Sequence, residues 1–248
     1  MRNIWTIAKR EYDHYFITPI AYVVGVALLF LVGGYFAFLL FAANQQATQG
    51  FGFVPEIPEL NNLFAFLLLL ATPALTMRLL ADETRTGTIE LLLTAPVRDY
   101  ELVVGKWLGS LLFIVTLIAV TFIFPFVLNS QVDPGIDQKI LLSSYLGLIL
   151  LAGAFLAIGV GVSAVFSNQV TAFVATFAIF IILWWLIGIP GNLIPVGGEF
   201  FNYMVMNSHF GSTLNSGSIN LSDLVYFFSL IALGLFTGTV AIEVRRWR

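Results

Sequence analysis

The chain contains no cysteine and only two histidines, and charged residues make up just 10% of the sequence. Without cysteine it has no disulfide bonds, thiolate metal sites or cysteine nucleophiles, although this leaves the redox compartment undetermined. A soluble domain usually has about 25% charged residues. The net charge of −3 argues weakly against nucleic acid as a partner. These shortages argue against both a soluble domain and a nucleic-acid-binding protein.

Apolar residues are abundant instead: they form 59% of the sequence and give a mean hydropathy of +0.94. A helix needs roughly 20 predominantly apolar residues to cross the hydrocarbon core of a bilayer. Six runs are long enough, and they predict an all-α, polytopic protein with six transmembrane helices embedded in a lipid bilayer. The runs cover residues 17–43, 60–77, 107–128, 140–166, 170–189 and 224–244.

The basic residues predict the orientation of these helices. Lys and Arg concentrate in cytoplasmic loops, and six spans place both termini on the same side of the membrane. That side carries ten of the eleven basic residues, and Lys139 alone falls opposite. We therefore expect a multi-pass protein of the plasma (inner) membrane with both termini in the cytoplasm. Arg78, Lys106 and Glu243 lie at span ends, where long side chains can reach the interface.

Residues 1–16 precede the first span and have a pattern of their own. Trp5, Ala8, Tyr12 and Tyr15 recur at spacings of three and four, which predicts a short helix lying in the cytoplasmic interface. A basic tail that only sets the topology is the alternative. The apolar run that follows is longer than the core of a signal peptide, so we expect it to be retained as a span.

The segment 188–223, before the last span, mixes proline and glycine with apolar residues such as Phe200, Phe201 and Met204. Irregular backbone at membrane depth must pack on protein or line a water-filled cavity. We interpret the segment as an external re-entrant or interfacial hairpin. A loop whose aromatic residues lie in the interfacial belt is the alternative.

The cytoplasmic segment 78–106 reads RLLADETRTGTIELLLTAPVRDYELVVGK. Gly87 is expected to start a short helix, with Glu90 reaching back to its first backbone N–H groups. The apolar run from Ile89 to Leu93 is too short to cross a membrane, and it favours docking in a groove of another protein. Folding of this run onto the chain's own surface is the alternative.

This segment resembles the cytoplasmic loop of ABC-2 type permeases, the membrane subunits of ATP-binding-cassette exporters. The resemblance rests on the pattern R-T-G-T-I-E-L-L-L-T-A-P-V followed by G-K, placed between the second and third of six spans. Small permeases associated with gliding motility and with nitrous-oxide-reductase maturation are the most similar branch. The span count, the N-terminal helix and the external segment also resemble that family, so the likeness covers the whole chain as one permease domain, 1–248.

The resemblance implies that residues 78–106 carry a coupling helix that docks on a separate ATP-binding-cassette ATPase subunit. It also implies a second permease copy or paralogue, and export as the direction of transport. The sequence has no G-x-x-x-x-G-K-[ST] phosphate-binding loop. We therefore expect no enzyme activity and no cofactor in this chain, with ATP and Mg²⁺ bound by the partner. The implied ATPase contacts are Glu83, Arg85, Gly87, Thr88, Glu90, Leu91, Leu92, Thr94 and Pro96.

Small residues spaced four apart predict close packing between membrane helices. Pro73 and Pro125 lie inside spans and are expected to kink them. Frequent glycine is also a general property of membrane helices, so the pattern does not by itself assign a dimer interface. The residues concerned are Gly105 with Gly109, Gly153 with Ala157 and Gly161, and Gly234 with Gly238.

Three other functions stay open at this point. A secondary transporter driven by an ion gradient usually carries ionisable residues inside its spans, and the six predicted runs contain none in their cores. A membrane anchor that recruits an ATPase for mechanical work would have the same cytoplasmic loop. An intramembrane hydrolase would have to be built around Ser208 and His209, but adjacency alone does not define a nucleophile and its base.

Overall fold

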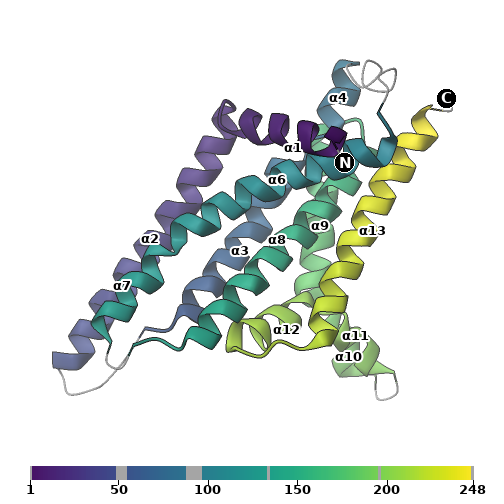
Figure 1. Cartoon of the computed structure of the whole chain (residues 1–248). Coiled ribbons are helices and arrows are strands. Elements are labelled where there is room, and N and C mark those ends of the chain that lie inside the picture. The colour runs from purple at the N-terminus through teal and green to yellow at the C-terminus, as the bar shows by residue number, and fades with distance from the viewer. Residues whose placement is uncertain (1, 49–54, 88–96, 133–134, 195–196, 247–248) are drawn as a thin grey trace.

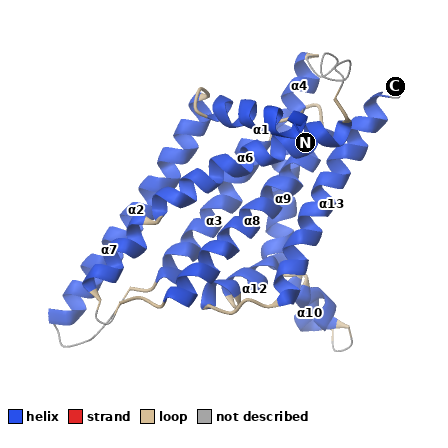
Figure 2. Cartoon of the chain, in the orientation of Figure 1, coloured by secondary structure: helices blue, strands red, loops and turns tan. Residues whose placement is uncertain are grey.

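The computed structural model describes residues 2–48, 55–87, 97–132, 135–194 and 197–246, which form helices, turns and loops without any strand. Within these residues, six segments are long and apolar enough to cross a membrane. Figures 1 and 2 show them side by side in one bundle. The predicted all-α, six-span membrane fold is confirmed. The segments are Pro19–Gln46, Ile57–Thr86, Asp99–Gln131, Gln138–Val165, Gln169–Leu193 and Leu221–Arg246.

Most helix boundaries lie within a few residues of the predicted ones. The third span is the exception, because its helix begins at Asp99 and not at Trp107. The fifth span changes from α-helix to a π-helical turn before it ends. In chain order the span helices are α2 (Pro19–Thr48), α3 (Ile57–Thr76), α6 (Asp99–Thr121) with α7 (Ile123–Gln131), α8 (Gln138–Val165), α9 (Gln169–Ile181) with η1 (Ile182–Leu186) and α10 (Gly188–Leu193), and α13 (Leu221–Arg246).

Helix α8 forms the centre of the bundle. In its most apolar stretch 83% of the residues are buried, against 28% in the corresponding stretches of α2 and α13. It packs against α3, α6, α9 and α13. The peripheral helices expose large apolar side chains, among them Phe30 of α2 and Phe236 of α13. Such outward-facing apolar surface fits a protein that is surrounded by lipid.

The bundle has two distinct ends (Figure 1). The terminal end carries α1 (Arg2–Tyr15), which lies across the spans, together with α4 (Ala81–Thr86) and the last residues of α13. The distal end carries α11 (Gly198–Tyr203), α12 (Met206–Gly211) and the 3₁₀ turn η2 (Leu214–Ser216). Both ends of the described chain therefore lie at the same end of the bundle.

Pro73 and Pro125, which were predicted to kink their spans, affect their helices differently. The third span is interrupted at Phe122, between α6 and α7. Pro125 has no N–H to donate to the carbonyl of Thr121, and the Tyr145 hydroxyl donates to that carbonyl instead, at 3.1 Å. Pro73 lies inside α3, which continues past it to Thr76.

At the distal end, the segment before the last span folds into short helices that pack back on the bundle. The Ser143 hydroxyl of α8 donates to the Leu214 carbonyl at 2.6 Å. The Asn215 amide donates to the Pro58 carbonyl at 2.8 Å. Helices α10 and α11 approach each other closely at Gly191 and Gly198. Part of this segment therefore forms a helical cap on α3, α8 and α13.

Candidate functional site

At the terminal end, helix α1 lies directly on the first turns of α6. A Cβ atom added at Gly105 would lie 2.8 Å from Cβ of Ile7, and one at Gly109 would lie 2.7 Å from the Ala8 carbonyl oxygen. These separations are too short for any side chain. Gly105 and Gly109 therefore seat α1 on α6, so their close contact is with the N-terminal helix and not with another span.

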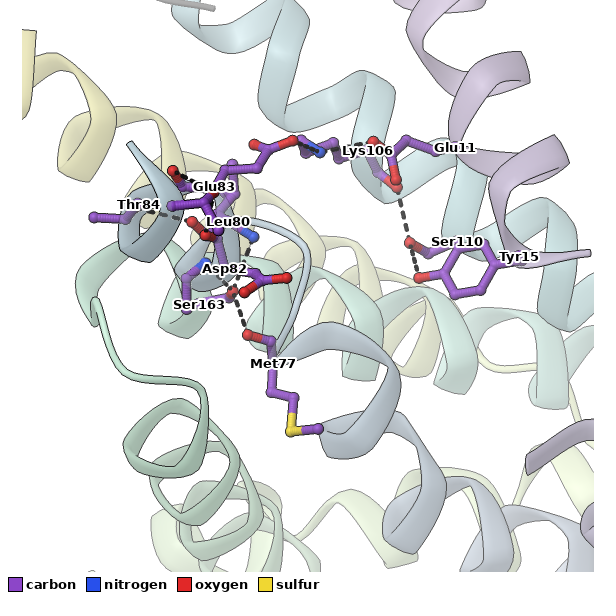
Figure 3. A network of polar contacts seen from close by, with 12 residues as sticks. Glu11, Tyr15, Met77, Leu80, Asp82, Glu83, Thr84, Lys106, Ser110 and Ser163 are labelled. Atoms are coloured by element: carbon purple, nitrogen blue, oxygen red, sulfur yellow. Dashed lines mark hydrogen bonds and ion pairs between the residues drawn. The ribbon is translucent and has the colours of Figure 1, made fainter. Parts of the chain in front are cut away.

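Lys106 lies beneath this contact and joins three helices (Figure 3). Its ammonium group donates to Glu11 of α1 at 2.7 Å and to Glu83 of α4 at 2.8 Å. Lys106 is only 2% exposed, so it does not reach out to the interface as the sequence suggested. The prediction failed because α6 begins at Asp99, which places Lys106 inside the helix and under α1.

A second contact secures the end of α1. The Ser110 hydroxyl donates to the Lys106 carbonyl at 2.9 Å, so the Tyr15 hydroxyl, 2.9 Å away, must donate its own proton to Ser110. Burial raises the pKa of the Tyr15 phenol and keeps it in the protonated form that this hydrogen bond needs. The Tyr15 ring also stacks on Phe113, with centroids 4.7 Å apart.

Helix α4 is anchored to the bundle through Ser163, near the end of α8. The Ser163 hydroxyl oxygen accepts hydrogen bonds from the backbone N–H groups of Leu80 and Ala81, at 3.1 and 3.0 Å. These N–H groups lie at the start of α4 and have no partner within the helix. Asp82 also accepts a bond from the Gln169 amide at 2.5 Å. Helix α4 is thereby fixed to both α8 and α9.

The last residues of α13 are bonded to other helices at this same end of the bundle. Arg246 forms an ion pair with Asp99, the first residue of α6, at 2.7 Å. Arg245 donates to the Val165 carbonyl at the end of α8, at 3.0 Å. The ends of α6, α8 and α13 are thus held together by two arginines.

The structure describes three of the implied ATPase contacts, Glu83, Arg85 and Gly87. Arg85 is exposed and pairs with Asp82 at 2.9 Å. Glu83 is turned inward to Lys106, so its carboxylate lies apart from the surface that Arg85 presents. Gly87 is the C-cap of α4, with a φ of 74°, a left-handed conformation that glycine adopts without strain. The helix predicted to begin at Gly87 would lie outside the described residues. Thr88, Glu90, Leu91, Leu92, Thr94 and Pro96 lie outside the described residues.

The other small residues lie where α8 crosses α13. A Cβ at Gly161 would lie 2.6 Å from the Gly234 carbonyl oxygen, and one at Gly234 would lie 2.6 Å from the Ala157 carbonyl oxygen. Gly238 approaches Gly161 and Val103. Gly153 lies against Ile231, at 3.3 Å from its Cδ1 to the added Cβ. This series therefore packs two spans of the same chain against each other.

The distal end contains a buried pair that the sequence interpretation missed. His209 of α12 contacts Asp223 of α13, with Nδ1 and Oδ1 2.7 Å apart, and its Nε2 lies 2.7 Å from the Tyr203 carbonyl. The Ser208 hydroxyl donates its proton to the Val205 carbonyl and not to His209. The sequence did not indicate a buried role for Asp223, because this residue immediately precedes an apolar run and an acidic residue there is expected in the external loop.

The contacts of Lys106 were also missed, although the sequence offered a clue. Glu11 interrupts the basic residues of the N-terminal segment, and an acidic residue there serves no topological purpose. Pairing it with a lysine 95 residues later requires knowledge of how α1 crosses α6.

Comparisons with known proteins agree with this architecture. A sequence profile described as ABC-2 family transporter protein matches residues 5–197. The chain is also 28% identical, over 177 residues, to the "Probable ABC transporter permease protein NosY" of Pseudomonas aeruginosa. That alignment covers 69% of this chain and 63% of the relative, so less than two thirds of the relative is matched. With the profile matching well over half of its length, the chain belongs to the ABC-2 family of transporter proteins.

Proposed function

We propose that this chain is the membrane permease subunit of an ABC transporter that exports its substrate. ATP and Mg²⁺ would bind to a separate ATPase subunit, and two permeases would form the membrane pathway. Family membership and the printed function of the relative support this assignment. The terminal end would face the cytoplasm of a plasma membrane, because ten of the eleven basic residues fall on that side.

The observation that carries the proposal is the contact of Lys106 with Glu11 and Glu83. Glu83 belongs to α4, which leads directly into the segment that resembles a coupling helix. Glu11 belongs to the helix that lies across the end of the bundle. Removing one partner of a buried ion pair costs about 3–5 kcal/mol, so α1, α4 and α6 would move together when an ATPase pushes on them.

A movement of α4 would reach the spans through α8 and α13. Ser163 connects the start of α4 to α8, and α8 packs along α13 at the small residues around Gly161 and Gly234. An ATPase can drive transport only if it binds two arrangements of the permease with different affinity. A rigid connection between the docking segment and the central helix would convert that difference into movement of the spans.

The first test is to purify the tagged, full-length chain from its own host and identify the proteins that accompany it. We expect an ATP-binding-cassette ATPase in stoichiometric amount. ATP hydrolysis by the complex is then measured in lipid nanodiscs. Recovery of the intact chain without any such ATPase would contradict the proposed function.

The second test replaces Lys106 with Met, which keeps the length of the side chain but removes its charge. We expect the ATPase to remain bound while the ATP hydrolysis rate falls by about tenfold, a typical size for coupling between two sites. Lys106→Arg is the matched control and should retain most of the activity. A triple variant with Glu11→Gln and Glu83→Gln removes the uncompensated carboxylates, so a low rate there reflects lost coupling and not misfolding. An unchanged rate in both Met variants would show that force does not pass through Lys106.

A further inference from the structure

A cavity of about 860 Å³ opens at the terminal end between α1, the start of α2, the end of α3 and α4. Its volume is within the range of roughly 300–1,000 Å³ that is usual for small-molecule sites. Its lining combines apolar and charged side chains. The apolar lining residues include Ile17, Ile20, Ala21, Leu75 and Leu79.

The charged lining residues are four cations and four carboxylates, but most of the carboxylates are already bonded to other side chains. Glu11 and Glu83 are bonded to Lys106, and Asp82 is bonded to Arg85 and Gln169. In the part of the chain that the structure describes, the other charged lining residues form no ion pair. They are three cations, Lys9, Arg10 and Arg78, and one carboxylate, Asp13.

The position of the cavity indicates what kind of molecule would fill it. It lies where the first span begins, because only residues 16–18 separate the end of α1 from the start of α2, and Ile17 and Thr18 line the cavity. The apolar side chains at this point are open to the surroundings: Ile17 is 76% exposed and Ile20 is 38% exposed. A ligand with an anionic head and an apolar chain could therefore place the head among the cations and leave the chain along α2, in the lipid.

We propose that this cavity binds the headgroup of an anionic phospholipid of the cytoplasmic leaflet. The phosphate would contact Lys9, Arg10 and Arg78, and an acyl chain would follow Ile17 and Ile20. The assignment rests on the orientation given in the proposed function, and cytoplasmic leaflets are the ones rich in anionic lipid. Because Glu83 and Lys106 also line the cavity, a bound lipid would stabilise α1 against α4 and so support the coupling contact.

The test uses the purified full-length chain in detergent with added phosphatidylglycerol or phosphatidylcholine. Bound lipid is counted by native mass spectrometry. We expect phosphatidylglycerol to bind at least tenfold more tightly, and Arg10→Ala with Arg78→Ala to weaken it by about tenfold or more, because charge-assisted hydrogen bonds are lost. Lys139→Ala removes an exposed cation at the distal end and is the matched control, which should bind as the unmodified chain does.

Two further arms separate the alternatives. Ile17→Asp should weaken phosphatidylglycerol binding, whereas glycerol 3-phosphate, which has no acyl chain, should bind poorly to every form. Equal binding of glycerol 3-phosphate and the lipid would overturn the proposal in favour of a free phosphate ester. Unchanged lipid binding in the arginine variants, with lower recovery of the ATPase, would overturn it in favour of a protein contact. All lipid measurements are made without the ATPase, so they are independent of the test of the proposed function.

Discussion

Among the described residues, each end of the bundle buries a charged cluster, but the two clusters join different kinds of segment. At the terminal end, Lys106 bonds Glu11 and Glu83, which are 95 and 23 residues away along the chain. At the distal end, His209 pairs with Asp223, only 14 residues away. The first cluster joins three helices from different parts of the chain. The second attaches a short helix to the span that follows it.

The two clusters differ in how they would connect movements of neighbouring helices. A lysine held by two carboxylates from separate helices allows a displacement of either helix to reach α6. The His209 pair, stacked on Tyr226 with centroids 4.0 Å apart, instead closes the distal cap on α13. Under the proposed function, the terminal end would transmit movement and the distal end would hold a fixed cover over the spans.

The strongest way to break this comparison is to show that the two ends do not face opposite sides of the membrane. Because the sequence has no cysteine, Thr6→Cys and Ser218→Cys each introduce the only thiol at an exposed position. An impermeant maleimide added to intact cells should label Ser218→Cys completely and Thr6→Cys only after lysis. Asn215 is unsuitable for this experiment because it is 1% exposed. Labelling of both variants from outside would refute the topology.

The next largest effect concerns the stability of the two clusters. Lys106→Met leaves two carboxylates without their cation and should lower the free energy of unfolding by about 3–5 kcal/mol. His209→Phe keeps an aromatic ring on Tyr226 and leaves one carboxylate unpaired, so we expect a smaller loss of about 1–3 kcal/mol. Unfolding in detergent, followed by circular dichroism, measures both. A larger loss in the distal variant would reverse the ranking of the two ends.

An effect about as large as that of His209→Phe is expected where α8 and α13 connect the two ends. Gly234→Ala would place a Cβ 2.6 Å from the Ala157 carbonyl oxygen, and the helices would have to separate, at a cost of about 1–3 kcal/mol. Gly34→Ala is the matched control, because a Cβ there meets nothing within 4 Å. We expect the control to unfold at the same temperature as the unmodified chain or slightly higher. Equal behaviour of both variants would show that the close approach is not needed.

The sequence predicted the spans well because a long apolar run is a local property. It predicted the start of α6 poorly because the first turn of that helix is polar. The residues of this turn find their partners on other helices: Asn3 of α1 donates to Glu101, and Arg246 of α13 pairs with Asp99. The sequence did not indicate that Gly87 ends a preceding helix, α4, where it adopts a positive φ. The spacing of Gly161 and Gly234 indicated close packing but not the partner helix. The Lys106 site could not be predicted, because each of its three residues comes from a helix placed by tertiary packing.

The smallest effect is expected at Tyr15, which supports the terminal cluster without belonging to it. Tyr15→Phe keeps the stacking on Phe113 but removes one buried hydrogen bond, worth about 0.5–1.5 kcal/mol. Because burial raises the pKa of Tyr15 in the folded chain, the folded state retains the phenol proton after the unfolded state has lost it. The stability of the unmodified chain should therefore fall as the pH rises above the ordinary pKa of tyrosine. Unfolding curves at increasing alkaline pH should show a shallower fall for Tyr15→Phe, and parallel curves would mean that the phenol is not buried against Ser110.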